Sequence, residues 1–132
     1  MSLSDPIADM LTRIRNAGRA KHPSCELHGG RVKKAILDIL KDEGFIKTYE
    51  ESVENNISKI QVQLKYDKSK KPVITEIDRV SKPGKRIYIK AEEVVPYKSN
   101  MGISIISTSR GIMTNKKAMK LRLGGEVICN VS

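Results

Sequence analysis

The 132-residue sequence has no tryptophan, one phenylalanine, four tyrosines and only two cysteines. Cys25 and Cys129 are too few and too far apart for the disulfide framework of a small secreted domain, so we interpret both as reduced core thiols. No run approaches the roughly 20 apolar residues of a membrane-spanning helix. The N-terminus also lacks the basic-then-apolar pattern of a signal peptide. We therefore expect a cytoplasmic protein that does not enter a membrane.

The motifs of several common enzyme classes are absent as well. There is no G-x-x-x-x-G-K-[ST] loop, no G-x-S-x-G elbow and no H-E-x-x-H helix. An alternative pairs Ser107 or Ser109 as nucleophile with His22 or His28 as base, but no orienting acid or substrate pocket is recognisable. We predict that the chain is not an enzyme.

One spacing is compatible with a metal site: His22-x-x-Cys25-x-x-His28, with Cys129 as a fourth ligand. Strong zinc signals pair their ligands more tightly than this, and each cysteine also fits an alternating apolar pattern. We therefore expect no metal and no cofactor.

The charge of the chain is strongly basic and unevenly distributed. Lys and Arg number 25 against 15 Asp and Glu, which gives a net charge of +10. Residues 1–68 hold 12 basic and 10 acidic residues (+2), and residues 69–132 hold 13 and 5 (+8). Such an excess in one half indicates a polyanionic partner, most commonly nucleic acid. An acidic membrane surface is the alternative, but it requires an apolar face beside the cations.

Two amphipathic helices are predicted in the first half. Asp5 before Pro6 is typical of a helix N-terminus and opens a helix over about residues 5–17. Gly29-Gly30 leads into a second helix, which ends at Gly44. The helical residues that we expect to be buried are Ile7, Met10, Ile14, Val32, Ile36, Ile39 and Leu40.

These helices should pack on a small sheet. Residues 24–28 alternate as a short strand that includes Leu27, and residues 45–53 and 57–66 form two strands around an Asn55-Asn56 turn. The first half thus has the order α-β-α-β-β. Arg13, Lys33 and Lys34 on the helices are candidate phosphate contacts, although the helix dipole or a solvated face explains them equally well.

Residues 67–72 (D-K-S-K-K-P) contain no apolar residue other than the closing proline, so we place a boundary there. We expect an α+β fold with two small subdomains, 1–68 and 73–132, the second mostly antiparallel β with one short helix. Residues 73–80 and 86–90 should be strands joined by a tight turn at residues 82–85. One face of the second strand presents Arg86, Tyr88 and Lys90, which suits phosphates and an unpaired base or ribose. A solvated edge is the alternative.

The last thirty residues carry the densest signal. An apolar strand from Ile103 breaks into Ser107, Thr108 and Ser109, followed by Arg110. Thr114 can then N-cap a helix through Leu121 that ends at Gly124-Gly125, before a strand over residues 126–131. The charged candidates of this region are Lys116, Lys117, Lys120 and Glu126.

Three separated blocks carry a family resemblance: D-P-I-A-D-M-L-T-R-I-R-N-A from Asp5, R-V-S-K-P-G-K-R-I-Y from Arg79, and S-T-S-R-G-I-M-T-N-K-K-A with G-G-E-V-I-C from Ser107. The sequence resembles the family of the eighth protein of the bacterial small ribosomal subunit, over nearly its whole length. The resemblance implies the same two-part fold. It also implies a structural constituent of the small subunit and a primary binder of the central domain of 16S rRNA that helps to assemble the platform of the 30S subunit.

Further partners follow from the resemblance alone. They are neighbouring small-subunit proteins, the fifth and the twelfth, and in some bacteria the messenger of its own operon, which the protein represses. The resemblance places base and sugar contacts at Ser107, Thr108 and Ser109, where short hydroxyl groups also suit RNA chemically. The alternative is a local turn in which these hydroxyls bond to neighbouring backbone groups.

Overall fold

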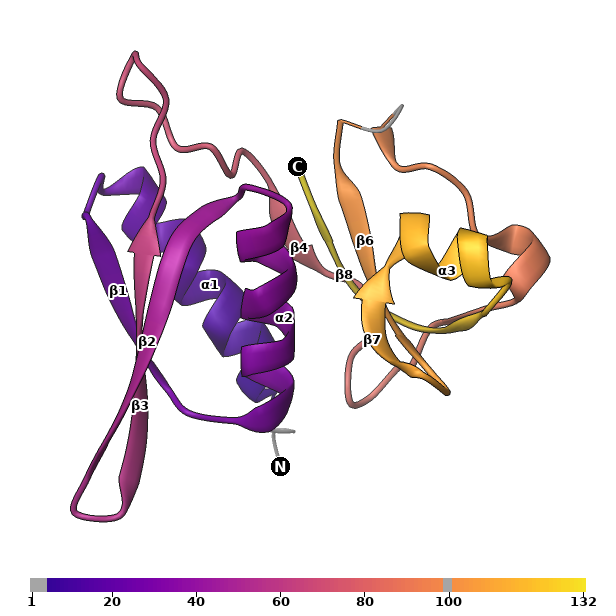
Figure 1. Cartoon of the computed structure of the whole chain (residues 1–132), viewed down its shortest axis with the longest axis horizontal. Helices are drawn as coiled ribbons and strands as arrows, with labels where there is room; N and C mark the ends of the chain where they lie inside the picture. The colour runs from indigo at the N-terminus through magenta and orange to yellow at the C-terminus, as the bar shows by residue number, and fades with distance from the viewer. Residues whose placement is uncertain (1–4, 99–100) are drawn as a thin grey trace. The chain divides into compact units, whose positions relative to one another are not determined.

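The computed structural model of the chain describes residues 5–98 and 101–132. The fold is α+β, as predicted (Figure 1). The elements in chain order are α1 (Pro6–Arg19), β1 (Ser24–His28), α2 (Arg31–Asp42), β2 (Ile46–Glu54), β3 (Ile57–Leu64), β4 (Ile77–Arg79), β5 (Tyr88–Ile89), the 3-10 helix η1 (Ala91–Glu93), β6 (Ile103–Thr108), β7 (Gly111–Thr114), α3 (Asn115–Leu121) and β8 (Gly125–Val131).

Two compact units make up the chain. Of the described residues, one unit comprises residues 9–75, and the other comprises residues 5–8, 76–98 and 101–132. We refer to them as the N-terminal and the C-terminal unit. The subdomain limits 1–68 and 73–132 stay a prediction.

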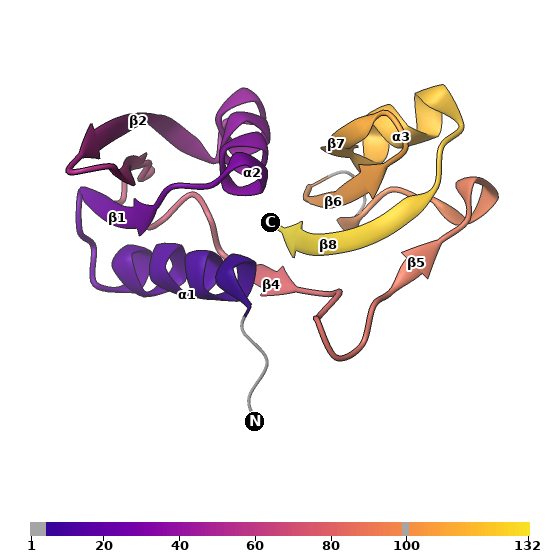
Figure 2. The same ribbon diagram turned by 90° about the horizontal axis from the view of Figure 1, so that it is seen from below.

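The N-terminal unit is a three-stranded antiparallel sheet in the order β1-β3-β2, with α1 and α2 against it (Figures 1 and 2). Ile60, Val62 and Leu64 alternate along β3 and are buried, whereas Lys59 and Gln61 are exposed. A sheet with one buried face needs cover on that face only, which the two helices provide. The predicted element order of this half is confirmed.

Local signals determine where the elements of this unit begin and turn. The Asp5 carboxylate accepts a hydrogen bond from the Ala8 amide at 3.1 Å, as an N-cap does, and α1 runs two residues past its predicted end. Asn55 and Asn56 have φ values of 51° and 65°, which a two-residue type I′ hairpin turn requires. Gly44 follows α2 at φ 80°. These three predictions are confirmed.

The buried face of α2 is rotated from the predicted one. Ile36 and Leu40 are buried as expected, but Leu37 is also fully buried, whereas Val32 is 42% exposed and Ile39 is half-buried. With about 100° between successive helical residues, Leu37 moves the centre of the buried face, and Val32 then lies roughly 90° away from it. The prediction for Val32 was therefore wrong. On α1, Met10 and Ile14 are buried and Ile7 is half-buried.

In the C-terminal unit, β8 lies between β6 on one edge and both β4 and β5 on the other (Figure 2). The register pairs Ile77 with Val131 in β4 and Tyr88 with Glu126 in β5. The strands β4 and β5 therefore pair with successive segments of the same edge of β8 and run in the same direction. The loop between these two strands leaves the sheet. The predicted strands over residues 73–80 and 86–90 are shorter than expected and do not form a hairpin with each other.

The reason for this difference lies in the loop itself. Lys82 and Lys85 exchange two backbone hydrogen bonds at 3.0 and 2.9 Å and close a turn of their own. Ser81 donates its amide to the Val127 carbonyl, and the Val127 amide donates to the Ile87 carbonyl, both at 3.0 Å. The turn thus returns the chain to β8. Because β4 and β5 pair with a strand far away in sequence, no pattern of neighbouring residues indicates this pairing.

A second hairpin, β6–β7, was not predicted, because the four residues Gly111–Thr114 are too few to show an alternating pattern. It pairs Thr108 with Gly111 and Ile106 with Met113. Ile106, Met113, Ala118 and Val94 form a buried cluster under α3. The hydroxyl of Thr114 accepts from the Lys117 amide at 3.2 Å, which confirms the predicted N-cap. The helix α3 runs through Leu121 as predicted, but Arg122 at φ 56° caps it, not Gly124-Gly125.

We expect Gly125→Ala to lower the free energy of unfolding by about 3 kcal/mol. The added methyl group would clash with backbone atoms, which cannot move aside as a flexible side chain can. A Cβ at Gly125 would lie 2.1 Å from the Ser107 carbonyl oxygen. Gly30→Ala is the matched control, since its Cβ would meet only the Lys33 side chain, at 3.5 Å or more. Urea unfolding should show a loss of about 1 kcal/mol or less for the control, because Gly30 is the N-cap of α2 and Ala is less favourable than Gly there. Equal losses in both variants would contradict this account.

Candidate nucleic-acid interface

The sheet register aligns three of the predicted site residues across neighbouring strands. Glu126 on β8 lies opposite Tyr88 on β5 and opposite Ser107 on β6. Residues directly opposite in an antiparallel sheet point to the same face. We call Tyr88, Glu126 and Ser107 the polar row. Tyr88 is 71% exposed and the other two are partly exposed, so the row is accessible.

The polar row lies on the face opposite to α3. Ile106 and Val127, which alternate with Ser107 and Glu126, pack in or against the cluster under α3. Lys116, Lys117 and Lys120 are exposed on α3 itself. The structure therefore separates two groups of candidates that look continuous in the sequence: the polar row on one face and the α3 lysines on the other.

A buried serine holds the carboxylate of the polar row. Ser81 has no exposed surface. Its hydroxyl donates to Glu126 Oε2 at 2.5 Å and accepts from the Ile87 amide at 3.1 Å. Arg86 Nη1 donates to the same Glu126 oxygen at 3.1 Å. One serine thus ties the neck of the loop between β4 and β5 to the site.

Ser81 was missed by the sequence reasoning. A lone serine between two apolar patterns carries no signal of its own. The motif R-V-S-K-P-G-K-R-I-Y contains it, but nothing in that motif indicates that its hydroxyl faces Glu126 across 45 residues of chain.

The three successive hydroxyls have different surroundings. Thr108 Oγ1 donates to the Gly111 carbonyl at 2.8 Å and accepts from the Arg110 amide at 3.1 Å, so it forms the local turn that was the alternative interpretation. In the part of the chain that the structure describes, the hydroxyls of Ser107 and Ser109 make no side-chain hydrogen bond. They remain available as donors and acceptors, with Ser109 and Arg110 at the exposed tip of the hairpin.

The segment around β5 exposes the three residues predicted for one face of a strand, although β5 itself contains only Tyr88 of them. Arg86, Tyr88 and Lys90 are exposed, and Ile87 and Ile89 between them are half-buried. Arg86 forms an ion pair with Glu126, and its side chain keeps 46% of its surface exposed. The ring of Tyr88 therefore has a cation on each side in sequence and a carboxylate across the strand.

The candidates of the N-terminal unit already have partners within the protein. Arg13 pairs with Asp9 at 3.0 Å, and Lys34 pairs with Glu51 at 3.2 Å. Hydrogen bonds from Ser58 and then Lys34 lower the pKa of Glu51. Lys33 donates to the His28 carbonyl at 3.2 Å. Exposed pairs of this kind contribute little to stability, so a phosphate can displace them at small cost.

The cysteines are poor ligands and nucleophiles at neutral pH. Burial raises the pKa of the Cys25 thiol to about 11 and that of Cys129 to about 12, so both stay protonated. Within residues 5–98 and 101–132, no three His, Cys, Asp or Glu side chains are grouped to hold a metal ion. In the same residues no helix is long and apolar enough to cross a membrane.

Comparison with known proteins shows the class of the chain, which is a ribosomal protein. It belongs to the ribosomal protein S8 family, whose sequence model matches residues 5–132. The chain is 56% identical over 131 residues to the small ribosomal subunit protein uS8 of Leptospira biflexa, covering 99% of each chain. The corresponding proteins of Geotalea uraniireducens and Clostridium kluyveri are 47% and 46% identical over the same length, again covering 99% of each chain.

The family resemblance predicted from the three sequence blocks is thereby confirmed. A member of this family is a structural component of the small ribosomal subunit, and the prediction that the chain is not an enzyme is confirmed by that membership.

We expect Ser81→Ala to lower the free energy of unfolding by about 1–3 kcal/mol, because a buried amide and a carboxylate oxygen lose their shared partner. Chemical denaturation measures the change. Ser109→Ala removes an exposed hydroxyl without a side-chain bond and should stay within about 0.5 kcal/mol of the wild type. The predicted role of Ser81 would be wrong if the two variants unfolded alike.

Proposed function

We propose that the chain is a primary rRNA-binding protein, which binds the central domain of 16S rRNA and helps to assemble the platform of the 30S subunit. The observation that carries this proposal is the polar row. It combines an exposed aromatic ring, a fixed carboxylate and an unoccupied hydroxyl, with Arg86 and Lys90 beside them. All of these residues belong to the half of the chain that carries +8.

RNA suits this surface better than DNA. Side chains cannot read the deep, narrow major groove of an RNA duplex, so recognition uses the shallow groove, ribose hydroxyls and unpaired bases. Ser107 and Ser109 can donate to and accept from such groups, and a base can stack on the exposed ring of Tyr88. A helix of the DNA-reading kind, inserted into a major groove, has no counterpart among the described helices.

Glu126 has a distinct role in this proposal. Its carboxylate repels phosphates, so it cannot serve as a backbone contact. It accepts hydrogen bonds from a base N–H or a ribose O–H, and Ser81 and Arg86 hold it in place for this. A carboxylate held in this way selects for donors on the RNA and against acceptors.

The basic residues outside the polar row contact phosphates. Lys116, Lys117 and Lys120 do so from α3, and Arg110 does so from the hairpin tip. Arg13, Lys33 and Lys34 do so from the N-terminal unit. Family membership also supports contacts with the fifth and twelfth proteins of the small subunit and repression of the protein's own operon through its messenger. Each of these is a separate proposal.

RNA binding should depend strongly on salt, because Lys and Arg displace counterions from phosphates. For about five contacts, log K against log salt should fall with a slope of roughly −3 to −5. Lys116→Ala, Lys117→Ala and Lys120→Ala should each weaken all RNAs alike and lower the slope by about one or less. Filter binding to a 16S central-domain fragment and to an unrelated RNA measures both. Selective loss of the cognate RNA in one variant would contradict a backbone role for that lysine.

The hydroxyls should separate binding from stability. Ser107→Ala and Ser109→Ala should each lower affinity for the cognate RNA by about 1–3 kcal/mol, because polar groups on the RNA lose their partners. Their melting temperatures and salt slopes should not change. Thr108→Ala should also lower the melting temperature, because its hydroxyl bonds to the Gly111 carbonyl and the Arg110 amide. Unchanged cognate affinity in both serine variants would remove this hairpin from the binding surface.

A further inference from the structure

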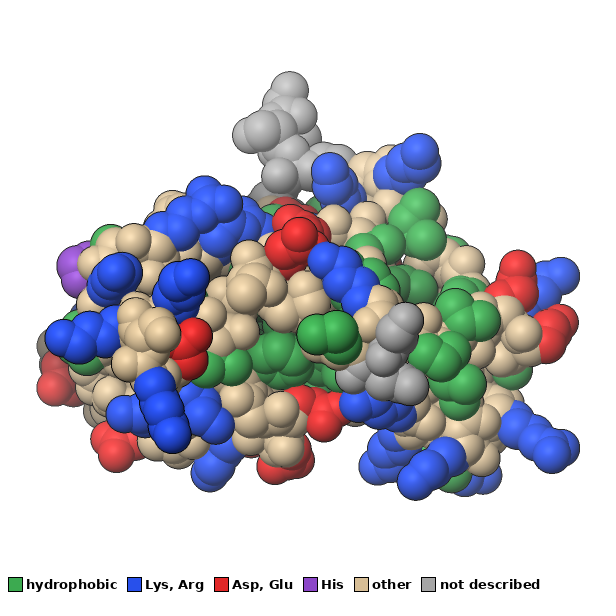
Figure 3. All heavy atoms as spheres, turned by 90° about the horizontal axis from the view of Figure 1, so that it is seen from above, with side chains coloured by type: hydrophobic (Ala, Val, Ile, Leu, Met, Phe, Trp, Pro, Cys, Tyr) green, Lys and Arg blue, Asp and Glu red, His purple; other side chains and the backbone are tan. Residues whose placement is uncertain are grey.

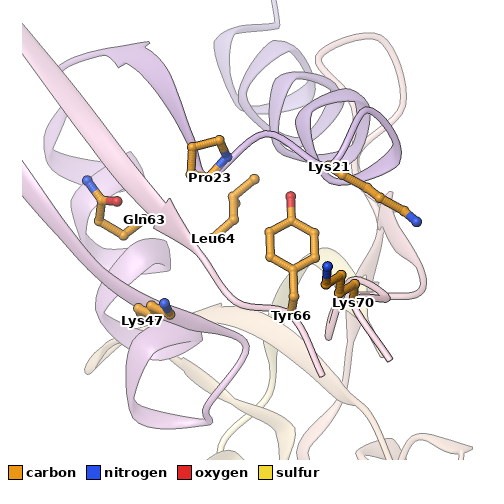
Figure 4. Close-up of a pocket in the computed structure, with 7 residues that line it drawn as sticks. All are labelled: Lys21, Pro23, Lys47, Gln63, Leu64, Tyr66 and Lys70. Carbon is orange, nitrogen blue, oxygen red and sulfur yellow. The ribbon is translucent and has the colours of Figure 1, made fainter. Parts of the chain in front are cut away.

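The N-terminal unit contains a pocket that shares no residue with the candidate nucleic-acid interface. Its volume is about 320 Å³, at the lower end of the roughly 300–1,000 Å³ range of ligand pockets. Figure 4 shows the side chains that line it, which are Lys21, Pro23, Lys47, Gln63, Leu64, Tyr66 and Lys70. All seven belong to residues 9–75.

The floor of the pocket is apolar and held in place. Leu64 is buried and forms its centre, with the ring of Pro23 beside it (Figure 4). The hydroxyl of Tyr66 donates to the carbonyl of His22 and lies 3.5 Å from the carbonyl of Ala17. These bonds fix the tyrosine ring against the end of α1. A ligand that binds to the ring therefore does not have to immobilise this side chain, which avoids an entropy cost.

The rim of the pocket is cationic. Lys21 and Lys70 lie on the Tyr66 side of the pocket and Lys47 lies on the opposite side (Figure 4). All three are exposed. Among the described residues they form no side-chain hydrogen bond or ion pair, in contrast to Lys34 and Lys59 of the same unit. Their charges are therefore not neutralised within the protein.

Two of these lysines stand where glycine is usual. Lys21 closes α1 at φ 57°, and Lys70 lies in the turn after Asp67 at φ 63°. A side chain in the left-handed region costs about 1 kcal/mol or more relative to glycine. The sequence thus keeps a lysine at both positions against the preference of the backbone, and both lysines border the same pocket.

The chemistry of the pocket defines its ligand. Three ammonium groups without a partner in the described protein favour an anion, and an aromatic and apolar floor favours a flat or apolar body attached to it. The amide of Gln63 can both donate to and accept from a base edge. A nucleotide unit combines these features, with a phosphate for the lysines, a base for the Tyr66 ring and polar base edges for the amide. Figure 3 shows Lys and Arg side chains gathered on the left of the view, over the N-terminal unit.

We propose that this pocket is a second RNA-binding site, which holds one unpaired nucleotide of an RNA chain with its phosphate among Lys21, Lys47 and Lys70 and its base on Tyr66. The site goes beyond the function proposed above, because it shares no residue with the polar row or with the phosphate contacts named there. It gives the protein a second point of attachment on RNA.

The test compares two triple variants of the full chain, each of which removes three positive charges. K21A/K47A/K70A removes the rim of the pocket. K41A/K65A/K68A is the matched control, because its lysines belong to the same unit but do not line the pocket. Exposed lysines contribute little to stability, so both variants should melt like the wild type.

The pocket variant should bind the 16S central domain roughly tenfold or more weakly at 0.1 M salt, with a salt slope smaller by about two, since each lost single-strand contact changes it by about 0.7. The decrease in log K for the control should be less than half of the decrease for the pocket variant. Equal losses of affinity in the two variants would overturn the proposal for the pocket, but they would not contradict the role proposed for the polar row. Failure of the wild type to bind the RNA would instead overturn the function proposed above.

A cross-linking experiment identifies the occupant. Wild-type protein bound to central-domain RNA that carries 4-thiouridine at its unpaired positions should give, on irradiation, an RNA adduct on the peptide that contains Tyr66. The pocket variant should lose this adduct and keep adducts near Ser107. Adducts near Ser107 alone in the wild type would overturn the proposal. The proposal would also be overturned if the pocket bound adenosine or uridine monophosphate to saturation but the RNA gave no Tyr66 adduct. A third contrary result would be that a neighbouring ribosomal protein, and not RNA, protects Tyr66.

Discussion

The C-terminal unit depends on the two paired edges of β8. This strand holds β6 on one edge and β4 and β5 on the other, so Ser107 and Tyr88 meet at Glu126 although they are 19 residues apart in sequence. The approach is close enough that the Ser107 carbonyl leaves no space for a Cβ at Gly125. The buried half of β8, with Cys129 and Val131, anchors the strand, and its other end carries the site.

Hydroxyl groups of similar chemistry serve different purposes in this unit, and their neighbours decide which. Ser81 and Thr108 satisfy groups of the protein itself: one fixes a carboxylate, and the other fixes a turn. Ser107 and Ser109 have no such partner among the described residues and face outward. In the proposed function, such a site reads RNA with side chains whose supporting hydrogen bonds are already complete. Recognition therefore does not compete with folding.

Sequence patterns predicted the features that depend on neighbours in the chain. Asp5 before Pro6, the Asn55-Asn56 turn and the cap at Thr114 each act within four residues, and each was confirmed. Partner choice between strands depends on distant residues, so β4 and β5 were wrongly paired with each other. The residues of the candidate site could be selected by type, but their cross-strand neighbours and the support from Ser81 could not. The division of the candidates between two faces of one sheet also required the structure.

That division limits how RNA can lie on the protein. The polar row and the α3 lysines occupy opposite faces of the same sheet, so one straight duplex along the row cannot reach the lysines. Contacts on both faces require either two RNA segments or one segment that bends around the hairpin. In the RNA-binding mode proposed above, base-reading groups lie on one face and phosphate-binding groups on the other, so the first face fixes the register of one segment while the second attracts another. In that mode the protein holds together two RNA segments whose phosphate charges repel each other.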